Sequence, residues 1–118
     1  MPSIWAKSAP QSSLNMIRVQ VAAEDYIGPV CDEVWGYNVL QHVLDPAQVI
    51  ETAKRHATKT VRWFDWTDTP LADHHPHSIS ADWLRAQFDG WRIVRDERGG
   101  KVVGPHSQRF IAIVAERI

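Results

Sequence analysis

The segment from Cys31 to Pro46, CDEVWGYNVLQHVLDP, constrains the fold of this chain more than any other. Its first half, Asp32 to Tyr37, is rich in β-branched and aromatic residues, which is typical of a strand. Asn38 to Val43 follows as an apolar run with three polar side chains, and Asp45-Pro46 is typical of a helix start. Ligands bind at the carboxyl ends of strands in open α/β sheets, so these polar groups are candidates for a site. A core strand, loop and helix cap without a ligand is the alternative.

Length and composition favour one intracellular domain. The chain has 118 residues, which is enough for one hydrophobic core and too few for two independent domains. Thirteen lysines and arginines against 14 acids give a net charge of −1, so there is no electrostatic case for a nucleic-acid or membrane partner. The single cysteine, Cys31, excludes an internal disulfide, and no apolar stretch approaches membrane-spanning length. We therefore expect a cytoplasmic protein.

The rest of the sequence predicts alternating strands and helices. Residues 1–15, interrupted by Pro10, are expected to form an N-terminal arm or short helix, and residues 16–118 a single domain. Further strands are expected at 16–21, 60–66, 91–95 and 109–115, and helices at 46–57 and 81–88. A strand, helix and strand in succession imply parallel pairing, and the last two strands should close the sheet as an antiparallel hairpin.

A polar loop before the second expected helix holds His74, His75 and His77. Two imidazoles with Asp68 or Asp73 could bind a metal ion, but the spacing fits no strong zinc motif. Contact with a substrate and a plain surface loop are the other two interpretations. We take His75 and His77 as candidates for substrate contact and assign no metal site.

The order of these elements and the residues on them resemble the C-terminal half of a class I S-adenosylmethionine-dependent methyltransferase. The matching segments are VQVAAED, DEVWGYNVLQHVLDP, TVRWFDWTDTP, HPHSISADWL and RFIAIVAER, within residues 16 to 116. The Asn-Val-Leu-x-His-Val-x-Asp-Pro run is moderately specific, and the other segments are supportive. The resemblance implies an α/β fold with a partial Rossmann-like (class I methyltransferase-like) sheet, flanking helices and an antiparallel C-terminal hairpin.

The resemblance also implies S-adenosylmethionine as the cofactor and suggests which residues bind it. Glu24 or Asp25 matches the acidic group that accepts a hydrogen bond from the adenine amino group, and Tyr26 would pack on the ring. We expect parallel strands to bring Asp25 and the corner that starts at Asn38 to the same edge of the sheet. The segment that lines the methionine and methyl-transfer side of the cofactor is matched by Asn38, Val39 and Leu40.

His42 matches a histidine that some members of the family place near the substrate. A neutral imidazole titrates near working pH, so we expect His42 to take a proton from an accepting oxygen or nitrogen. A structural hydrogen-bonding role at the approach to the helix is the alternative.

The sequence does not contain the family's first strand with its glycine-rich loop, E/D-x-G-x-G-x-G. Gly28 and Gly36 lie in a different context, and Gly99-Gly100 belongs to a hairpin. We therefore expect a methyltransferase-like protein that transfers a methyl group to an unspecified acceptor, such as a small molecule. It would need a complementing half, supplied by a homo-oligomer or a partner chain. The alternative is a non-catalytic remnant that acts as an interaction module.

Overall fold

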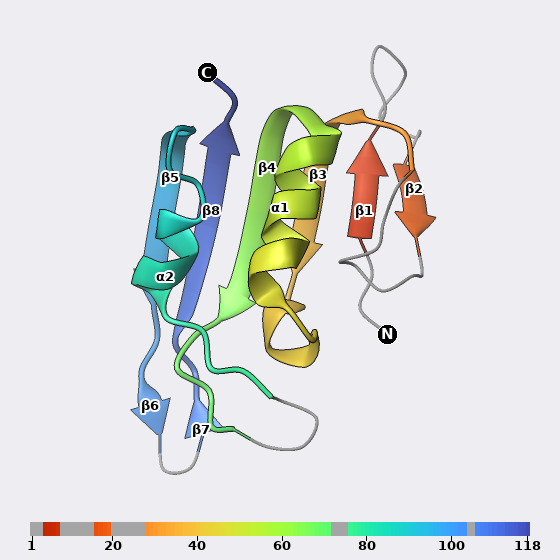
Figure 1. Ribbon diagram of the computed structural model, residues 1–118. Helices are drawn as coiled ribbons and strands as arrows, with labels where there is room; N and C mark the ends of the chain where they lie inside the picture. Colours follow the sequence, from red (N-terminus) through yellow and green to blue (C-terminus); the bar gives the residue numbers. More distant parts are fainter. Residues whose placement is uncertain (1–3, 8–15, 20–27, 72–75, 104–105) are drawn as a thin grey trace.

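The computed structural model of this chain is built on one six-stranded sheet (Figure 1). It describes residues 4–7, 16–19, 28–71, 76–103 and 106–118, with side chains described within 28–71, 76–101 and 108–118. The strand order in the sheet is β2-β1-β3-β4-β8-β5. The strands are β1 (Ile4–Lys7), β2 (Met16–Val19), β3 (Cys31–Tyr37), β4 (Ala57–Trp66), β5 (Arg92–Gly99) and β8 (Phe110–Glu116), and β6 (Val102–Val103) and β7 (His106–Ser107) form a separate two-stranded ladder.

The central unit of the fold is β3, helix α1 (Pro46–His56) and β4. β3 and β4 pair in parallel, which confirms the expectation from the strand, helix and strand order. The helix begins as predicted, because the Asp45 side chain accepts a hydrogen bond from Gln48 N at 3.1 Å and Pro46 occupies the first turn. Its buried stripe includes Val49 and Ile50. Local sequence signals therefore position the helix over the two parallel strands.

The C-terminal hairpin is also confirmed. β5 and β8 pair antiparallel, and β8 lies between β4 and β5, so the last strand runs against the parallel pair. Helix α2 (Ala81–Ala86) starts at Ser80, whose hydroxyl accepts a hydrogen bond from Trp83 N at 3.0 Å. The helix ends two residues before the predicted end at Phe88.

The N-terminal strands differ from the prediction. Residues 4–7, expected within an arm or short helix, form β1, which pairs antiparallel with both β2 and β3. The strand expected at 16–21 exists at Met16–Val19, and β1 separates it from β3 in the sheet. An antiparallel pair needs only a short connection, whereas a parallel neighbour needs a crossover of a dozen or more residues. The short hairpin therefore takes the free edge of β3.

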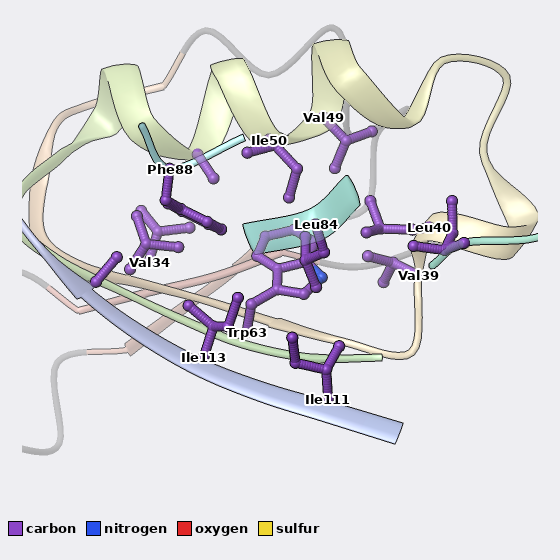
Figure 2. Packing of buried hydrophobic residues seen from close by; sticks show 14 of the residues in the cluster. Val34, Val39, Leu40, Val49, Ile50, Trp63, Leu84, Phe88, Ile111 and Ile113 are labelled. Atoms are coloured by element: carbon purple, nitrogen blue, oxygen red, sulfur yellow. The ribbon is translucent and has the colours of Figure 1, made fainter. Parts of the chain in front are cut away.

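Both helices lie on the same face of the sheet, and the hydrophobic core fills the space between them and the strands (Figure 1). Figure 2 shows Trp63 within this cluster, between side chains from the strands and side chains from the helices. The core residues are Val34, Val39, Leu40, Val43, Val49, Ile50, Ala53, Ala57, Val61, Trp63, Ile79, Leu84, Phe88, Ile111, Ile113 and Ala115. Among the described helices, none is long and apolar enough to cross a membrane.

The Trp63 indole takes up the space beside Gly36, its partner in the parallel ladder. A Cβ atom at Gly36 would lie 2.4 Å from carbon atoms of the indole ring. Any side chain at this position would therefore displace the largest fully buried side chain of the core.

We expect Gly36→Ala to destabilise the protein by about 1–3 kcal/mol, because overpacking forces core side chains out of their rotamers. Urea unfolding measures the change in the free energy of unfolding. The control is the same substitution in a Trp63→Phe background, where the smaller ring leaves room and the added cost of the methyl group should fall. An equal cost in both backgrounds would contradict this explanation.

Candidate functional site

The carboxyl ends of β3 and β4 meet at one edge of the sheet, and the segment from Asn38 to His42 lies there. Asn38 follows β3 directly with a φ of 51°, a left-handed conformation that asparagine adopts more readily than most residues. Its backbone N–H donates to the Phe64 carbonyl of β4 at 2.8 Å. The short 3-10 helix η2 (Leu40–His42) then leads towards α1. The predicted corner is therefore fixed to both parallel strands.

Polar side chains of this corner interact with one another. The Gln41 amide donates to Asn38 Oδ1 at 2.8 Å, and Gln41 Nε2 lies 3.4 Å from His42 Nε2. Gln41 is buried, and its Oε1 forms no hydrogen bond within the described part of the chain. The His42 side chain is exposed. The corner thus presents the solvent-accessible imidazole of His42 beside the buried carboxamide of Gln41.

The side chains of Val39 and Leu40 anchor the corner to the protein interior. Both side chains are buried in the hydrophobic core. Figure 2 shows them at the same end of the cluster. A ligand at this edge would therefore meet the backbone of these two residues and not their side chains.

Asp65, in β4, is a component of the site that the sequence analysis missed. Its side chain is fully buried at 0% exposure. Oδ2 accepts hydrogen bonds from Trp63 Nε1 at 2.8 Å and from Leu40 N at 3.3 Å. One carboxylate therefore joins the core tryptophan to the first residue of η2.

Burial raises the pKa of the Asp65 carboxyl to about 6, because an ionised carboxylate is poorly solvated inside the protein. The hydrogen bonds from Trp63 and Leu40 and the charge of His42 act in the opposite direction and limit the shift. A sequence signal for Asp65 did exist. It alternates in step with Val61 and Trp63, which places a carboxylate on the core face of the strand.

His77 connects the histidine loop to the corner. Its Nε2 lies 2.9 Å from the Leu44 carbonyl oxygen, which can only accept, so this nitrogen carries the hydrogen. Asp68, a carboxylate that the metal interpretation used, lies 3.5 Å from Arg109. Within the described residues, no three His, Cys, Asp or Glu side chains come together as a metal site.

Several predicted site residues lie outside the described residues: Glu24, Asp25, Tyr26 and His75. β2 runs in the same direction as β3, because both are antiparallel to β1. The carboxyl end of β2 at Val19 therefore points to the edge that holds Asn38. The expectation that Asp25 and Asn38 share this edge stays a prediction.

The class of fold follows from this arrangement. A sheet with a helix-connected parallel pair, a reversed last strand and a polar corner beyond the parallel strands is a class I methyltransferase-like α/β fold. No protein-family model matches the sequence, and no curated protein matches it. Similarity is found among solved structures.

Three solved structures illustrate the similarity. Magnesium protoporphyrin IX methyltransferase from Synechocystis PCC 6803 with bound SAM has a TM-score of 0.61 at 14% identity, over 85% of this chain and 45% of that one. TehB from Haemophilus influenzae has a TM-score of 0.62 at 14% identity, over 82% and 38%. A SAM dependent methyltransferase from Aquifex aeolicus has a TM-score of 0.54 at 15% identity, over 80% and 52%. This chain therefore spans about half of each solved chain or less.

The shifted pKa of Asp65 predicts a pH-dependent stability. The native pKa of about 6 exceeds the unfolded value near 3.8, so the native state holds a proton that the unfolded state has lost between these pH values. This contribution is complete below the unfolded pKa and disappears as the pH rises through the native pKa. We expect it to amount to about 3 kcal/mol, at 1.36 kcal/mol per unit.

Chemical denaturation of the wild type and Asp65→Asn at pH 4 and pH 7.5 measures this contribution. Asparagine keeps an acceptor for Trp63 and Leu40 and removes the titration, so the stability of the wild type relative to the variant should fall as the pH rises. Asp65→Ala instead leaves two buried N–H groups unpaired and should be less stable than Asp65→Asn by about 2–5 kcal/mol at either pH. A stability difference between wild type and Asp65→Asn that does not change with pH would refute the assignment.

Proposed function

We propose that this chain is the C-terminal half of a class I S-adenosylmethionine-dependent methyltransferase. It transfers a methyl group once a complementing half, from a partner chain or another copy, supplies the rest of the cofactor site. The observation that carries this proposal is the corner from Asn38 to His42, fixed between two parallel strands in a fold that matches SAM-dependent methyltransferases over 80–85% of this chain. The solved chains are about twice as long, which supports a missing half.

On the cofactor side, Asn38 and the backbone of Val39 and Leu40 line the methionine end of S-adenosylmethionine. Support comes from the burial of both apolar side chains, which leaves backbone groups at the edge. Glu24 or Asp25 accepts a hydrogen bond from the adenine amino group, and Tyr26 packs against the ring. The glycine-rich loop that would cradle the rest comes from a partner chain, because another copy of this chain has the same sequence without that loop.

When bound, the cofactor supplies a methyl group already activated by its sulfonium. The task left to this chain is to position the acceptor and to remove its proton. His42 does the latter, since its exposed imidazole can accept a proton from an oxygen or nitrogen nucleophile.

The acceptor, a small molecule, binds beside the histidine loop. The hydrogen bond from His77 to the Leu44 carbonyl holds this loop against the connection between η2 and α1. We expect His77, and His75 two residues before it in the sequence, to contact an acceptor that approaches His42. The hydrogen bond of His77 also limits its role to binding, because Nε2 is already used as a donor.

Isothermal titration of the purified chain with S-adenosylhomocysteine tests cofactor binding. We expect weak binding that falls by about tenfold in Asn38→Ala, equivalent to about 1.4 kcal/mol, and likewise in Asp25→Ala. Asp89→Ala is the matched control, because this exposed acid follows α2 at the opposite end of the sheet and should leave binding unchanged. Absence of heat at millimolar ligand would contradict cofactor binding by this half.

His42→Ala should lower methyl transfer by about 10²-fold or more, which is the usual contribution of a general base. Because the side chain is exposed, the free energy of unfolding should change by less than about 0.5 kcal/mol. Transfer of a labelled methyl group to a panel of small alcohols, amines and phenols, with the complementing half present, measures the activity. A collapse of thermal stability in the variant would assign His42 to structure instead.

A non-catalytic interaction module is the second candidate function. The observation in its favour is the short coverage of the solved methyltransferases, with the glycine-rich cofactor loop missing from the sequence. Under this function, S-adenosylhomocysteine would not bind to the purified chain even at millimolar concentration. The same titration therefore separates the two candidates.

A further inference from the structure

The sheet face opposite the two helices is rich in aromatic side chains. Trp35 and Tyr37 of β3 are 38% and 67% exposed on this face. Tyr37 stacks on Phe64 with ring centroids 5.0 Å apart, and Phe64 stacks on Phe110 at 5.5 Å. Trp66 packs edge-on against Phe64 and Phe110. These contacts join three neighbouring strands into one continuous aromatic surface, which we call the open face.

A hollow of about 270 Å³ lies on the open face. Its lining includes Trp35, Tyr37, Arg62, Phe64, Arg95 and Val114. The apolar floor and the guanidinium groups around it have the composition of an interface centre, where aromatic residues and arginine are enriched. Exposed apolar patches of this kind mark sites of association.

The parallel pairing of two strands in the sheet predicts that another layer of protein packs on the open face. All-parallel sheets occur almost only with both faces covered, whereas antiparallel sheets can leave one face to solvent, so the expectation of cover applies here at a parallel pair of strands. β3 and β4 form such a pair, yet both helices of the described residues lie on the other face (Figure 1). The open face therefore calls for a layer from outside the described part of this chain.

We infer that a second copy of this chain packs its own open face on this one. The argument comes from the register of the strands. One row across the face runs Trp35, Arg62, Val114 and Arg95, and the next runs Tyr37, Phe64, Ala112 and Glu97. Each row thus begins with an aromatic residue on β3 and ends with a charged residue on β5.

A two-fold axis that lies between the faces and runs parallel to the strands, between β4 and β8, makes these rows complementary. It places β3 of one copy opposite β5 of the other, so Trp35 meets the cation of Arg95 and the Tyr37 hydroxyl meets the carboxylate of Glu97. Trp66 and Phe110 meet across the centre. Sheets that pack face to face with nearly aligned strands are common, at an angle of about 30°.

The dimensions of the face set the strength to expect. Four strands at about 4.8 Å spacing and six residues at about 3.3 Å rise give a face of about 20 by 20 Å. Two such faces bury roughly 800 Å² in total, which is below the range of about 1,200–2,000 Å² for stable, specific interfaces and within the range of weak, transient ones. The dimer should therefore dissociate on dilution.

Sedimentation of the full chain from low micromolar to millimolar concentration, without cofactor, tests this inference independently of methyl transfer. We expect a monomer–dimer equilibrium. Tyr37→Glu places a carboxylate opposite Glu97 of the second copy and should weaken the dimer by about tenfold or more. Tyr37→Lys loses the same ring stacking but places a cation there, so it should weaken the dimer less.

Leu71→Glu is the matched control, because Leu71 is 70% exposed in the loop after β4 and off the open face. It should leave the equilibrium unchanged. Tyr37 is exposed, so its variants should keep the near-ultraviolet circular dichroism of the wild type. A monomer at every concentration, a dimer that Tyr37→Glu does not weaken, or equal effects of Tyr37→Glu and Tyr37→Lys would overturn the inference.

Discussion

The candidate site depends on one buried carboxylate. Asp65 accepts hydrogen bonds from the indole of Trp63 and from the backbone of Leu40, so it connects the core directly to the loop that carries Asn38 and His42. Burial of a charge costs several kcal/mol, and hydrogen bonds to a charged group recover about 1.5–3 kcal/mol each. Burial of the Asp65 carboxylate therefore lowers the stability of the protein, and its hydrogen bonds fix the position of this loop. Gly36 belongs to the same set of contacts, because its missing side chain leaves room for the Trp63 ring.

This arrangement explains how contacts within this chain alone fix the corner from Asn38 to His42. Val39 and Leu40 are buried on the core side, Asn38 is fixed by the Phe64 carbonyl, and Asp65 holds the turn between them. The position of the corner therefore does not depend on a bound ligand. Under the proposed function, a complementing half would supply the glycine-rich loop for the cofactor, and His42 on this chain would be the proton acceptor.

The sequence predicted the elements that have strong local signals. Asp45-Pro46 and Ser80 mark helix starts through their capping side chains, and the β-branched and aromatic residues of β3 and β4 mark strands on either side of α1. The short β1 carries no comparable signal. β1 lies beside β3 because it pairs with the free edge of that strand. This pairing depends on the tertiary structure, so the sequence of a four-residue segment does not predict it.

The site shows the same division between local and non-local information. The corner from Asn38 to His42 was predictable, because a polar group directly after a buried strand is a local pattern. Asp65 was missed because its role depends on which face of β4 it occupies and on a partner 25 residues away. That partnership arises only when β3 and β4 pair in parallel and their carboxyl ends meet.

The open face and the site edge are separate surfaces that meet at Tyr37. Tyr37 is the last residue of β3 and stacks on the open face, and Asn38 follows it directly at the edge. A layer on the open face would therefore lie beside the corner without covering His42, which lies beyond the strand end. The backbone of Asn38 is hydrogen-bonded to β4, and the ring of Tyr37 stacks on Phe64. Because Tyr37 and Asn38 are adjacent in the chain, a contact that fixes the Tyr37 ring also limits the movement of Asn38. Cover of the sheet and order at the site are thus coupled by chain connectivity, even though they use different side chains.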